Sequence, residues 1–167
     1  MRVVTPDDWR LWRELRLLAL EESASAFGSQ LADWQGDGDR EERWRARLSL
    51  PGSYNLLAIT AGRPVGMASG IPNENKRTIE LISMYVAPSG RGQGVGDRLV
   101  QAVAQWAVQA GARRLRLAVV AGNSHAEALY RRQGFRATGE LGEVLPDGVR
   151  REHIMAVELD GEGTGHG

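Results

Sequence analysis

Residues 91–96 read Arg-Gly-Gln-Gly-Val-Gly, between a run of strand-forming residues at 78–86 and a helical pattern that begins near Val95. Glycine lets the backbone turn through positive φ and approach a ligand closely. The first amides of a helix have no partner within the helix, and they carry a partial positive charge. A strand, a glycine-rich turn and a helix start, in this order, therefore predict a phosphate cradle that binds an anionic cofactor.

The spacing of this loop disfavours two commoner glycine motifs. A Walker loop needs Gly-Lys-Ser/Thr after four intervening residues, but the only lysine of the chain is Lys76, upstream of the loop. A dinucleotide fingerprint needs a third glycine three positions after the second, and that position, counted from Gly92 and Gly94, holds Asp97. We therefore expect neither a nucleoside triphosphate nor a dinucleotide in this loop.

The composition fits one enzyme-sized domain and selects no partner by itself. We expect a single domain over residues 1–159, followed by a disordered tail at 160–167. Lysine plus arginine and aspartate plus glutamate both number 21, so no net field favours nucleic acid or an anionic membrane. The chain has no cysteine, its three histidines are widely separated, and it has no signal-peptide or membrane-spanning apolar run. These features predict a cytoplasmic protein without a metal site.

Apolar periodicity predicts an alternating series of strands and helices. Trp9, Trp12 and Leu15 recur at helical spacing, whereas Ala61-Gly62-Arg63 is typical of a hairpin turn between two strands. The predicted elements are a strand at 2–4, a helix from about residue 7, a helix at 40–48, strands at 54–60, 64–71 and 77–86, a helix at 95–110, a strand at 114–120, a helix at 124–132, and strands at 135–140 and 150–159.

A second motif follows the glycine loop. Residues 123–130 read Asn-Ser-His-Ala-Glu-Ala-Leu-Tyr, and residues 131–135 continue Arg-Arg-Gln-Gly-Phe. Ser124 with Glu127 three residues later forms the sequence pattern of a capping box, which would place Asn123 just outside the helix. Gly134 is a helix stop.

The two motifs together resemble the GCN5-related N-acetyltransferase (GNAT) superfamily. Arg91-x-x-Gly94-x-Gly96 after a strand resembles the acetyl-CoA loop of that family, and residues 123–135 resemble its Asn-x-x-Ala-x-x-x-Tyr-x-x-x-Gly-Phe stretch. The resemblance implies an α/β (α+β) fold with a mixed, mostly antiparallel central sheet of about six to seven strands and about four flanking helices. It also implies that the sheet splays apart between the strand before the loop and the strand after the following helix.

The resemblance further implies which residues bind acetyl-CoA, the expected acetyl donor. Main-chain groups of Met84 and Val86 would pair with the pantetheine arm, to which Asn123 would add a contact. The amides of Gly92, Gln93, Gly94, Val95 and Gly96 would hold the pyrophosphate, and Arg91 would add a charge-assisted contact. Asp97 does not fit easily, because a carboxylate in the first helical turn suits the helix dipole but repels a phosphate. We therefore expect its side chain to point away.

Tyr130 is the predicted general acid. Acetyl transfer from a thioester to an amine expels a thiolate, which leaves more readily when a neighbouring hydroxyl donates a proton. By similarity to the family, that hydroxyl is the one of Tyr130. The alternative is a helix-face aromatic that only packs on the sheet.

The predicted general base is Glu80, on the strand before the loop. An alkyl ammonium with a pKa of about 10.4 is almost entirely protonated at pH 7, so a proton must leave before the nitrogen attacks. Glu80 lies where histone-acetylating relatives place a glutamate base. The alternatives are an exposed strand carboxylate without a role, and deprotonation through ordered water and backbone carbonyls.

The acceptor is the less determined half of the reaction. Acidic residues concentrate at 33–42, which favours a cationic acceptor at that wall of the cleft, although a solvated acidic loop explains them equally well. The leading function is acetyl transfer to a primary amine of a small molecule, by direct attack in a ternary complex. The alternatives are a protein or peptide amino-group acetyltransferase and a noncatalytic acyl-CoA-binding regulatory module. Family members often form homodimers, and strands 135–159 are the candidate interface here.

Overall fold

The computed structural model describes residues 1–22, 31–75, 77–145 and 148–159, and its elements follow the predicted order. The strands within these residues are β1 (Arg2–Val3), β2 (Tyr54–Thr60), β3 (Arg63–Pro72), β4 (Thr78–Val86), β5 (Arg114–Val120), β6 (Arg136–Val144) and β7 (Arg151–Glu158). The helices are α1 (Trp9–Glu22), α3 (Glu41–Leu48), α4 (Val95–Gln109) and α5 (Ser124–Arg132), with 3-10 turns at Pro6–Asp8, Gly36–Gly38 and Pro88–Gly90. The tail predicted at 160–167 and Lys76 lie outside the described residues.

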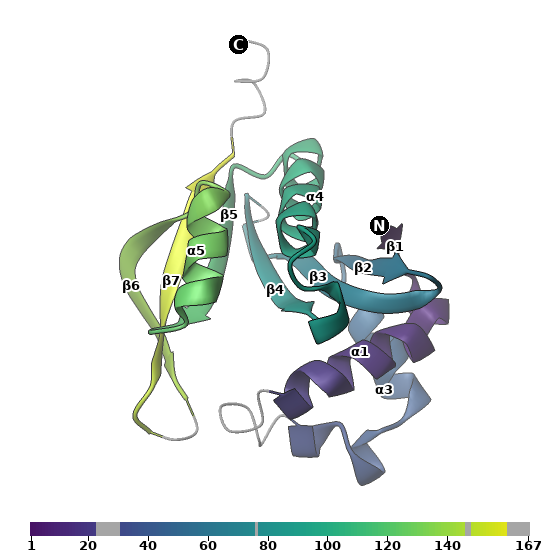
Figure 1. Cartoon of the computed structure of the whole chain (residues 1–167). Helices are drawn as coiled ribbons and strands as arrows, with labels where there is room; N and C mark the ends of the chain where they lie inside the picture. The colour runs from purple at the N-terminus through teal and green to yellow at the C-terminus, as the bar shows by residue number, and fades with distance from the viewer. Residues whose placement is uncertain (23–30, 76, 146–147, 160–167) are drawn as a thin grey trace.

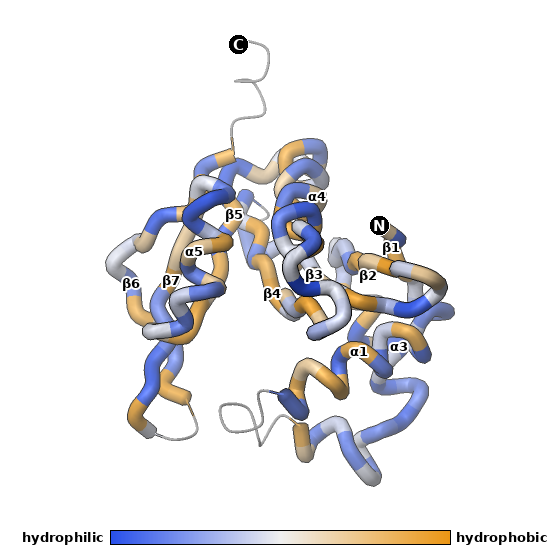
Figure 2. Tube along the Cα trace, in the orientation of Figure 1, coloured by the Kyte–Doolittle hydropathy of each residue, from blue (hydrophilic) through white to orange (hydrophobic). Residues whose placement is uncertain are grey.

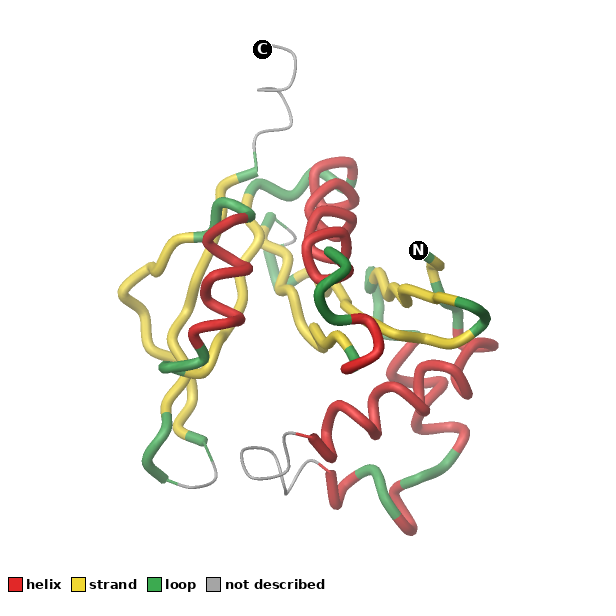
Figure 3. Tube along the Cα trace, in the orientation of Figure 1, coloured by secondary structure: helices red, strands yellow, loops and turns green. Residues whose placement is uncertain are grey.

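The strands form one seven-stranded sheet in the order β1-β2-β3-β4-β5-β7-β6 (Figures 1 and 3). All neighbouring pairs are antiparallel except β4 and β5, which run parallel. This parallel pair is joined through α4, as a crossover connection requires. The expected mixed, mostly antiparallel sheet is therefore confirmed.

Helices cover both faces of this sheet, and each face has its own core. α4 and α5 lie on one face and α1 and α3 on the other (Figure 1). Under α4, Leu99 and Leu115 are completely buried, and each such side chain contributes roughly 1.5–3 kcal/mol to stability. Under α1, Trp12 and Trp44 are completely buried. Figure 2 shows hydrophobic segments in the central strands between these layers.

None of the described helices is long and apolar enough to cross a lipid bilayer.

The sheet opens between β4 and β5. Their pairing is limited to residues 78–80 of β4 and 114–116 of β5, after which β4 pairs only with β3 and β5 only with β7. The opening coincides with a β-bulge in β4, where the register against β3 shifts and Ser83 has a φ of 54°. The two strands diverge from this point (Figure 1). The splayed sheet implied by the family resemblance is present.

Candidate active site

Two cavities meet at the opening of the sheet. The first, which we name the loop cavity, has a volume of about 400 Å³ and lies between the end of β4, residues 90–97 and α5. The second, the α1 cavity, has a volume of about 350 Å³ and lies on the other face, against α1, β4, β5 and β7. Met84, Tyr85 and Tyr130 line both. A molecule in one cavity therefore adjoins a molecule in the other at these three residues.

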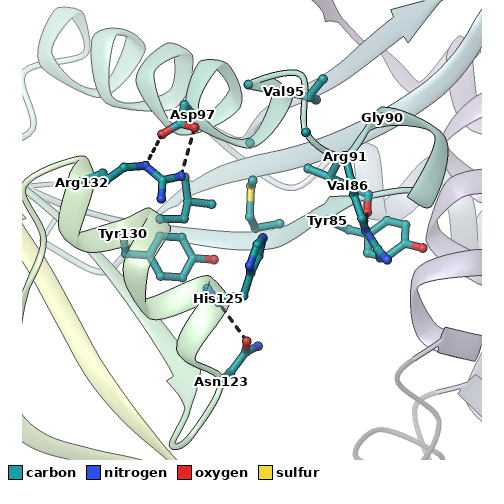
Figure 4. Close-up of a pocket in the computed structure, with 16 residues that line it drawn as sticks. Tyr85, Val86, Gly90, Arg91, Val95, Asp97, Asn123, His125, Tyr130 and Arg132 are labelled. Atoms are coloured by element: carbon teal, nitrogen blue, oxygen red, sulfur yellow. Dashed lines mark hydrogen bonds and ion pairs between the residues drawn. The ribbon is translucent and has the colours of Figure 1, made fainter.

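Most of the predicted site residues lie together in the loop cavity (Figure 4). Those that line it are Met84, Val86, Arg91, Gly92, Gly94, Val95, Gly96, Asn123 and Tyr130. The side chain of Gln93 instead donates to the carbonyl oxygen of Ser89 at 3.3 Å, outside this lining. Glu80 does not line either cavity.

The three glycines of the loop are needed for two different reasons. Gly92 and Gly94 have φ values of 77° and 75°, a conformation that costs other residues free energy. Gly96 has an ordinary φ, but a Cβ atom added there would lie 3.2 Å from Cδ2 of Leu129 on α5. The first two glycines therefore shape the turn, and the third lets α4 begin close to α5.

The backbone N–H groups of this turn are free to bind an anion. Gly94 is the N-cap of α4 and makes no side-chain capping bond, because it has no side chain. Among the described residues, the N–H groups from Gly92 to Gly96 have no hydrogen-bond partner. Unpaired amides at a helix N-terminus attract negative charge. The loop thus has the donors that a pyrophosphate needs.

Arg132 of α5 compensates the negative charge of Asp97, the carboxylate next to the glycine loop. The guanidinium donates from Nε and Nη2 to the Asp97 carboxylate at 3.3 and 3.2 Å, and Nε2 of Gln133 donates to it at 2.8 Å. Figure 4 shows the carboxylate turned toward α5. The hydrogen bond from Arg132 is the largest cause that holds the pKa of Asp97 below its ordinary value, and the hydrogen bond from Gln133 acts in the same direction. The carboxylate points toward a cation, which compensates its charge beside the loop.

Tyr130 combines a packed ring with an unpaired hydroxyl. The ring is buried and its centroid lies 5.8 Å from that of Phe135, as the packing alternative predicted. The hydroxyl has no hydrogen-bond partner among the described residues, and Figure 4 shows it directed into the cavity. Burial raises the pKa of Tyr130 to about 12, so the phenol keeps its proton near neutral pH. The group can therefore donate a proton but does not accept one as a phenolate.

The start of α5 corrects one prediction. Asn123, not Ser124, is the N-cap, and its Oδ1 accepts the N–H of Ala126 at 3.2 Å. The carboxylate of Glu127 accepts the N–H of Gly122 instead of completing a box with Ser124. The predicted capping box is wrong because asparagine is at least as good an N-cap as serine and stands one residue earlier. Capping thus accounts for the carbonyl oxygen of Asn123 and leaves its amide nitrogen without a described partner.

Arg91 lies at the cavity junction rather than over the loop amides. Its Nε donates to the carbonyl oxygen of Val86 at 3.1 Å, and its Nη2 pairs with Glu22 at the end of α1. The hydroxyl of Tyr85 donates to the same carboxylate. The hydrogen bond from Tyr85, and after it the bond from Arg91, lower the pKa of Glu22. Burial, and after it the hydrogen bond to Glu22, raise the pKa of Tyr85 to about 12. The cluster ties α1 to β4 where the cavities meet.

Glu80 forms an ion pair outside the two cavities. It lies in the part of β4 that still pairs with β5, and Nη1 of Arg116 donates to its Oε1 at 2.6 Å. Arg116 also donates to Glu140 of β6 at 2.7 Å. The structure thus places the predicted base in a partly exposed cluster of three charges.

The acidic segment at 33–42 does not line the α1 cavity. Asp39 accepts hydrogen bonds from Arg13 and from Nε1 of Trp44, which lower its pKa to about 2, and Glu41 pairs with Arg45. The predicted acidic wall therefore does not line this cavity, and arginines of α1 and α3 compensate much of its charge.

Several residues that line the two cavities are not among those predicted from the sequence. On α5, His125, Leu129 and Arg132 lie on one helical face at spacings of four and three residues, so the 3.6-residue period could have identified them. In the α1 cavity the missed residues include Arg16 and Glu152. No motif marks these two, because only the fold brings α1 and β7 together.

A splayed sheet, an amide-lined loop and a buried tyrosine whose hydroxyl faces the cavity are the features of an enzyme that transfers an acyl group from coenzyme A. Residues 12–135 match the family model described as Acetyltransferase (GNAT) family, and the chain belongs to that family of N-acetyltransferases.

Among known proteins, one relative supports the family and one solved structure has the same fold. An L-methionine sulfoximine/L-methionine sulfone acetyltransferase of Pseudomonas paraeruginosa is 31% identical over 128 residues, which cover 71% of this chain and 73% of that protein. The structure of yncA, a putative acetyltransferase from Salmonella typhimurium with its cofactor acetyl-CoA, has a TM-score of 0.74 at 23% identity, over 95% of this chain and 92% of that chain.

A third relative shares a shorter segment. The thialysine N-epsilon-acetyltransferase of Bos taurus is 43% identical over 58 residues, or 35% of this chain. The chain therefore matches 34% of that relative's length.

Proposed function

We propose that this N-acetyltransferase moves the acetyl group of acetyl-CoA to a primary amine of a small molecule, by direct attack in a ternary complex. The observation that carries the proposal is that the loop cavity and the α1 cavity lie on opposite faces of the sheet and meet at Tyr130. Donor and acceptor would enter from opposite sides and meet at one proton donor. The α1 cavity, at about 350 Å³, is at the lower end of the range for small-molecule sites.

The donor would occupy the loop cavity. The free amides from Gly92 to Gly96 would hold its pyrophosphate. The edge of β4 at Met84 and Val86 pairs with no described strand, and there only the carbonyl of Val86 has a partner, Arg91; this edge would pair with the pantetheine arm. The amide nitrogen of Asn123 is free to add a contact to that arm. Arg91 would contribute at the junction end of the arm, where its guanidinium already lies.

The proton transfers would then take place where the two cavities meet. The amine nitrogen attacks the thioester carbonyl carbon, so a C–N bond forms, the C–S bond breaks and the thiolate takes a proton from Tyr130. The nitrogen loses one proton to water, and Tyr130 regains one from solvent. A phenol with a raised pKa suits this role because it remains protonated until the thiolate forms beside it.

For the base, the position of Glu80 favours the water alternative. Glu80→Gln should keep kcat within about threefold of the wild type, because Glu80 faces Arg116 and neither cavity. Steady-state thiol release measures this, with Glu140→Gln as the matched control that removes the other carboxylate from Arg116. A loss of about 100-fold or more in Glu80→Gln alone would assign the base to Glu80.

Arg132→Ala should raise the KM for acetyl-CoA about tenfold and change kcat little. The substitution leaves the Asp97 carboxylate without its cation, beside amides that bind a phosphate, and a tenfold change corresponds to about 1.4 kcal/mol. Arg131→Ala is the control, because Arg131 is more exposed and pairs with Glu127 instead. Asp97→Asn added to Arg132→Ala should restore much of the affinity, and its failure to do so would contradict the charge argument.

The test of the proposed function is thiol release from acetyl-CoA with three classes of acceptor: small primary amines, peptides with free amino groups, and water alone. Release with small amines alone supports the proposal. Preferential release with peptides would assign the protein or peptide alternative. Tight binding of acetyl-CoA without release from any acceptor would assign the noncatalytic alternative.

A further inference from the structure

The α1 cavity holds a cation that has no counter-ion among the residues that the structure describes. Arg16 of α1 lines this cavity beside the apolar side chains of Ala19 and Leu20. It is partly buried, and it forms no hydrogen bond or ion pair with any described residue. The neighbouring Arg13 on the same helix, by contrast, is paired with Asp39. A guanidinium that is withdrawn from water without a partner favours the arrival of an anion.

A second cation adjoins the first. Arg47 of α3 donates to the oxygens of Asn55, Ser69 and Ser83 at 3.0, 3.0 and 3.1 Å, all of which are neutral. Burial, followed by the charge of Arg16, lowers the pKa of Arg47 to about 10. Ser83 also lines the α1 cavity, so both arginines act on the same space. Two neighbouring positive charges without a carboxylate partner make that space selective for anions.

The same cavity also contains one carboxylate. Glu152 of β7 lines it together with Tyr130. Its Oε1 accepts only a long hydrogen bond, 3.4 Å, from the N–H of Glu143, and no ion pair joins it to another described residue. The α1 cavity thus offers a site for an anionic group and a site for a cationic one.

We propose that the acceptor is zwitterionic and resembles an α-amino acid, with its carboxylate bound by Arg16 and its amino group beside Glu152. This inference rests on the proposed function and specifies its acceptor. Arginine binds a carboxylate through two parallel hydrogen bonds, which fixes the orientation of the molecule as well as its position. Glu152 attracts the ammonium form to the junction, where it loses a proton to water before the nitrogen attacks. The apolar wall formed by Leu20, Leu81 and Ile82 would contact the rest of the acceptor.

The test compares acceptors that differ only in the carboxylate. For the common L-α-amino acids, kcat/KM is measured for the acid, its carboxamide and the corresponding decarboxylated amine, with L-leucine, L-leucinamide and isoamylamine as one such set. The wild type should prefer an acid over its two analogues without a carboxylate about 10- to 100-fold. Arg16→Gln should remove this preference by lowering kcat/KM for the acid alone. Glu152→Gln should lower kcat/KM for the acid and the carboxamide alike, because both carry the ammonium group.

Arg10→Gln is the matched control. Arg10 is on the same helix, exposed, and lies over the ring of Trp9 rather than in the cavity, so its substitution should leave the preference intact. Thermal unfolding checks that each variant is folded. Acetylation of the carboxamides or decarboxylated amines at least as fast as the acids would overturn this inference and leave the proposed function standing. Binding of acetyl-CoA without acetylation of any amine would instead overturn the proposed function, and this inference with it.

Discussion

Tyr130→Phe is expected to lower kcat by about 100- to 10,000-fold and to leave the affinity for acetyl-CoA within about threefold of the wild type. The substitution removes one oxygen atom and keeps the ring that packs on Phe135. The hydroxyl forms no hydrogen bond with a described residue, so its removal breaks no structural contact. The loss should therefore fall on the step in which the thiolate leaves. Thiol release gives kcat, and calorimetry with coenzyme A gives the affinity.

The pH dependence provides an independent check of this role. The folded pKa of Tyr130 is raised to about 12, so the hydroxyl stays protonated as pH rises through the neutral range and is lost as a donor only near pH 12. Between pH 7 and 10, kcat should therefore change with pH in the same way in the wild type and in Tyr130→Phe, because Tyr130 does not ionise in this range. Tyr54→Phe is the control, because Tyr54 is stacked on Trp106, outside both cavities. Equal turnover of Tyr130→Phe and wild type would exclude Tyr130 as the acid.

The donor side of the site could be predicted from the sequence because its determinants are local. Gly92 and Gly94 need positive φ, and Gly96, in the first turn of α4, lets that helix lie close to α5, so the conformation of the turn is encoded within five residues. Residues 125, 129 and 132 share one face of α5, and the helical period is also a local property. The family resemblance rests on these same two segments.

The acceptor side could not be predicted in the same way, and β4 shows why. Strict alternation would place Glu80 on the same face as Met84 and Val86, since all three numbers are even. The bulge at Ser83 adds one residue, so Met84 and Val86 pack with Ile79 and the α4 core while Glu80 faces the other side. One extra residue in a strand reverses every side chain beyond it. No turn residue in the sequence marks this bulge.

The same reason applies to Arg16 and Glu152, which lie more than a hundred residues apart in the sequence. α1 packs on one face of the sheet, and β7 is inserted between β5 and β6, so the fold alone brings them to one cavity. Neither residue type is distinctive by itself, because the sequence has many arginines and glutamates on solvated faces. The unusual property of Arg16 is that it has no partner among the described residues, which only a structure can show.

Gly96→Val is expected to weaken acetyl-CoA binding by about 100-fold or more. A Cβ atom at this position would lie 3.2 Å from Leu129, 3.5 Å from Cε of Met84 and 3.7 Å from Cγ2 of Val86. The two additional methyl groups of valine would therefore extend into the loop cavity, where the pantetheine arm is proposed to lie between β4 and α5. The overpacking should also destabilise the fold by about 1–3 kcal/mol. Calorimetry with coenzyme A and thermal unfolding measure the two effects separately.

A graded series separates blockage of the cavity from general damage to α4. Gly96→Ala adds one methyl group at the tightest of these contacts, so it should weaken binding much less than Gly96→Val. Ala104→Val adds the same two methyl groups about two turns further along α4, at the edge of the core, and should lower stability without reducing affinity. Unchanged coenzyme A affinity in a folded Gly96→Val variant would place the pantetheine arm outside the gap between Met84 and Leu129. If Gly96→Val loses affinity while Gly96→Ala and Ala104→Val do not, the pantetheine arm lies in this gap. In that case the free amides of the loop are intact, and the substitution closes only the gap beside them.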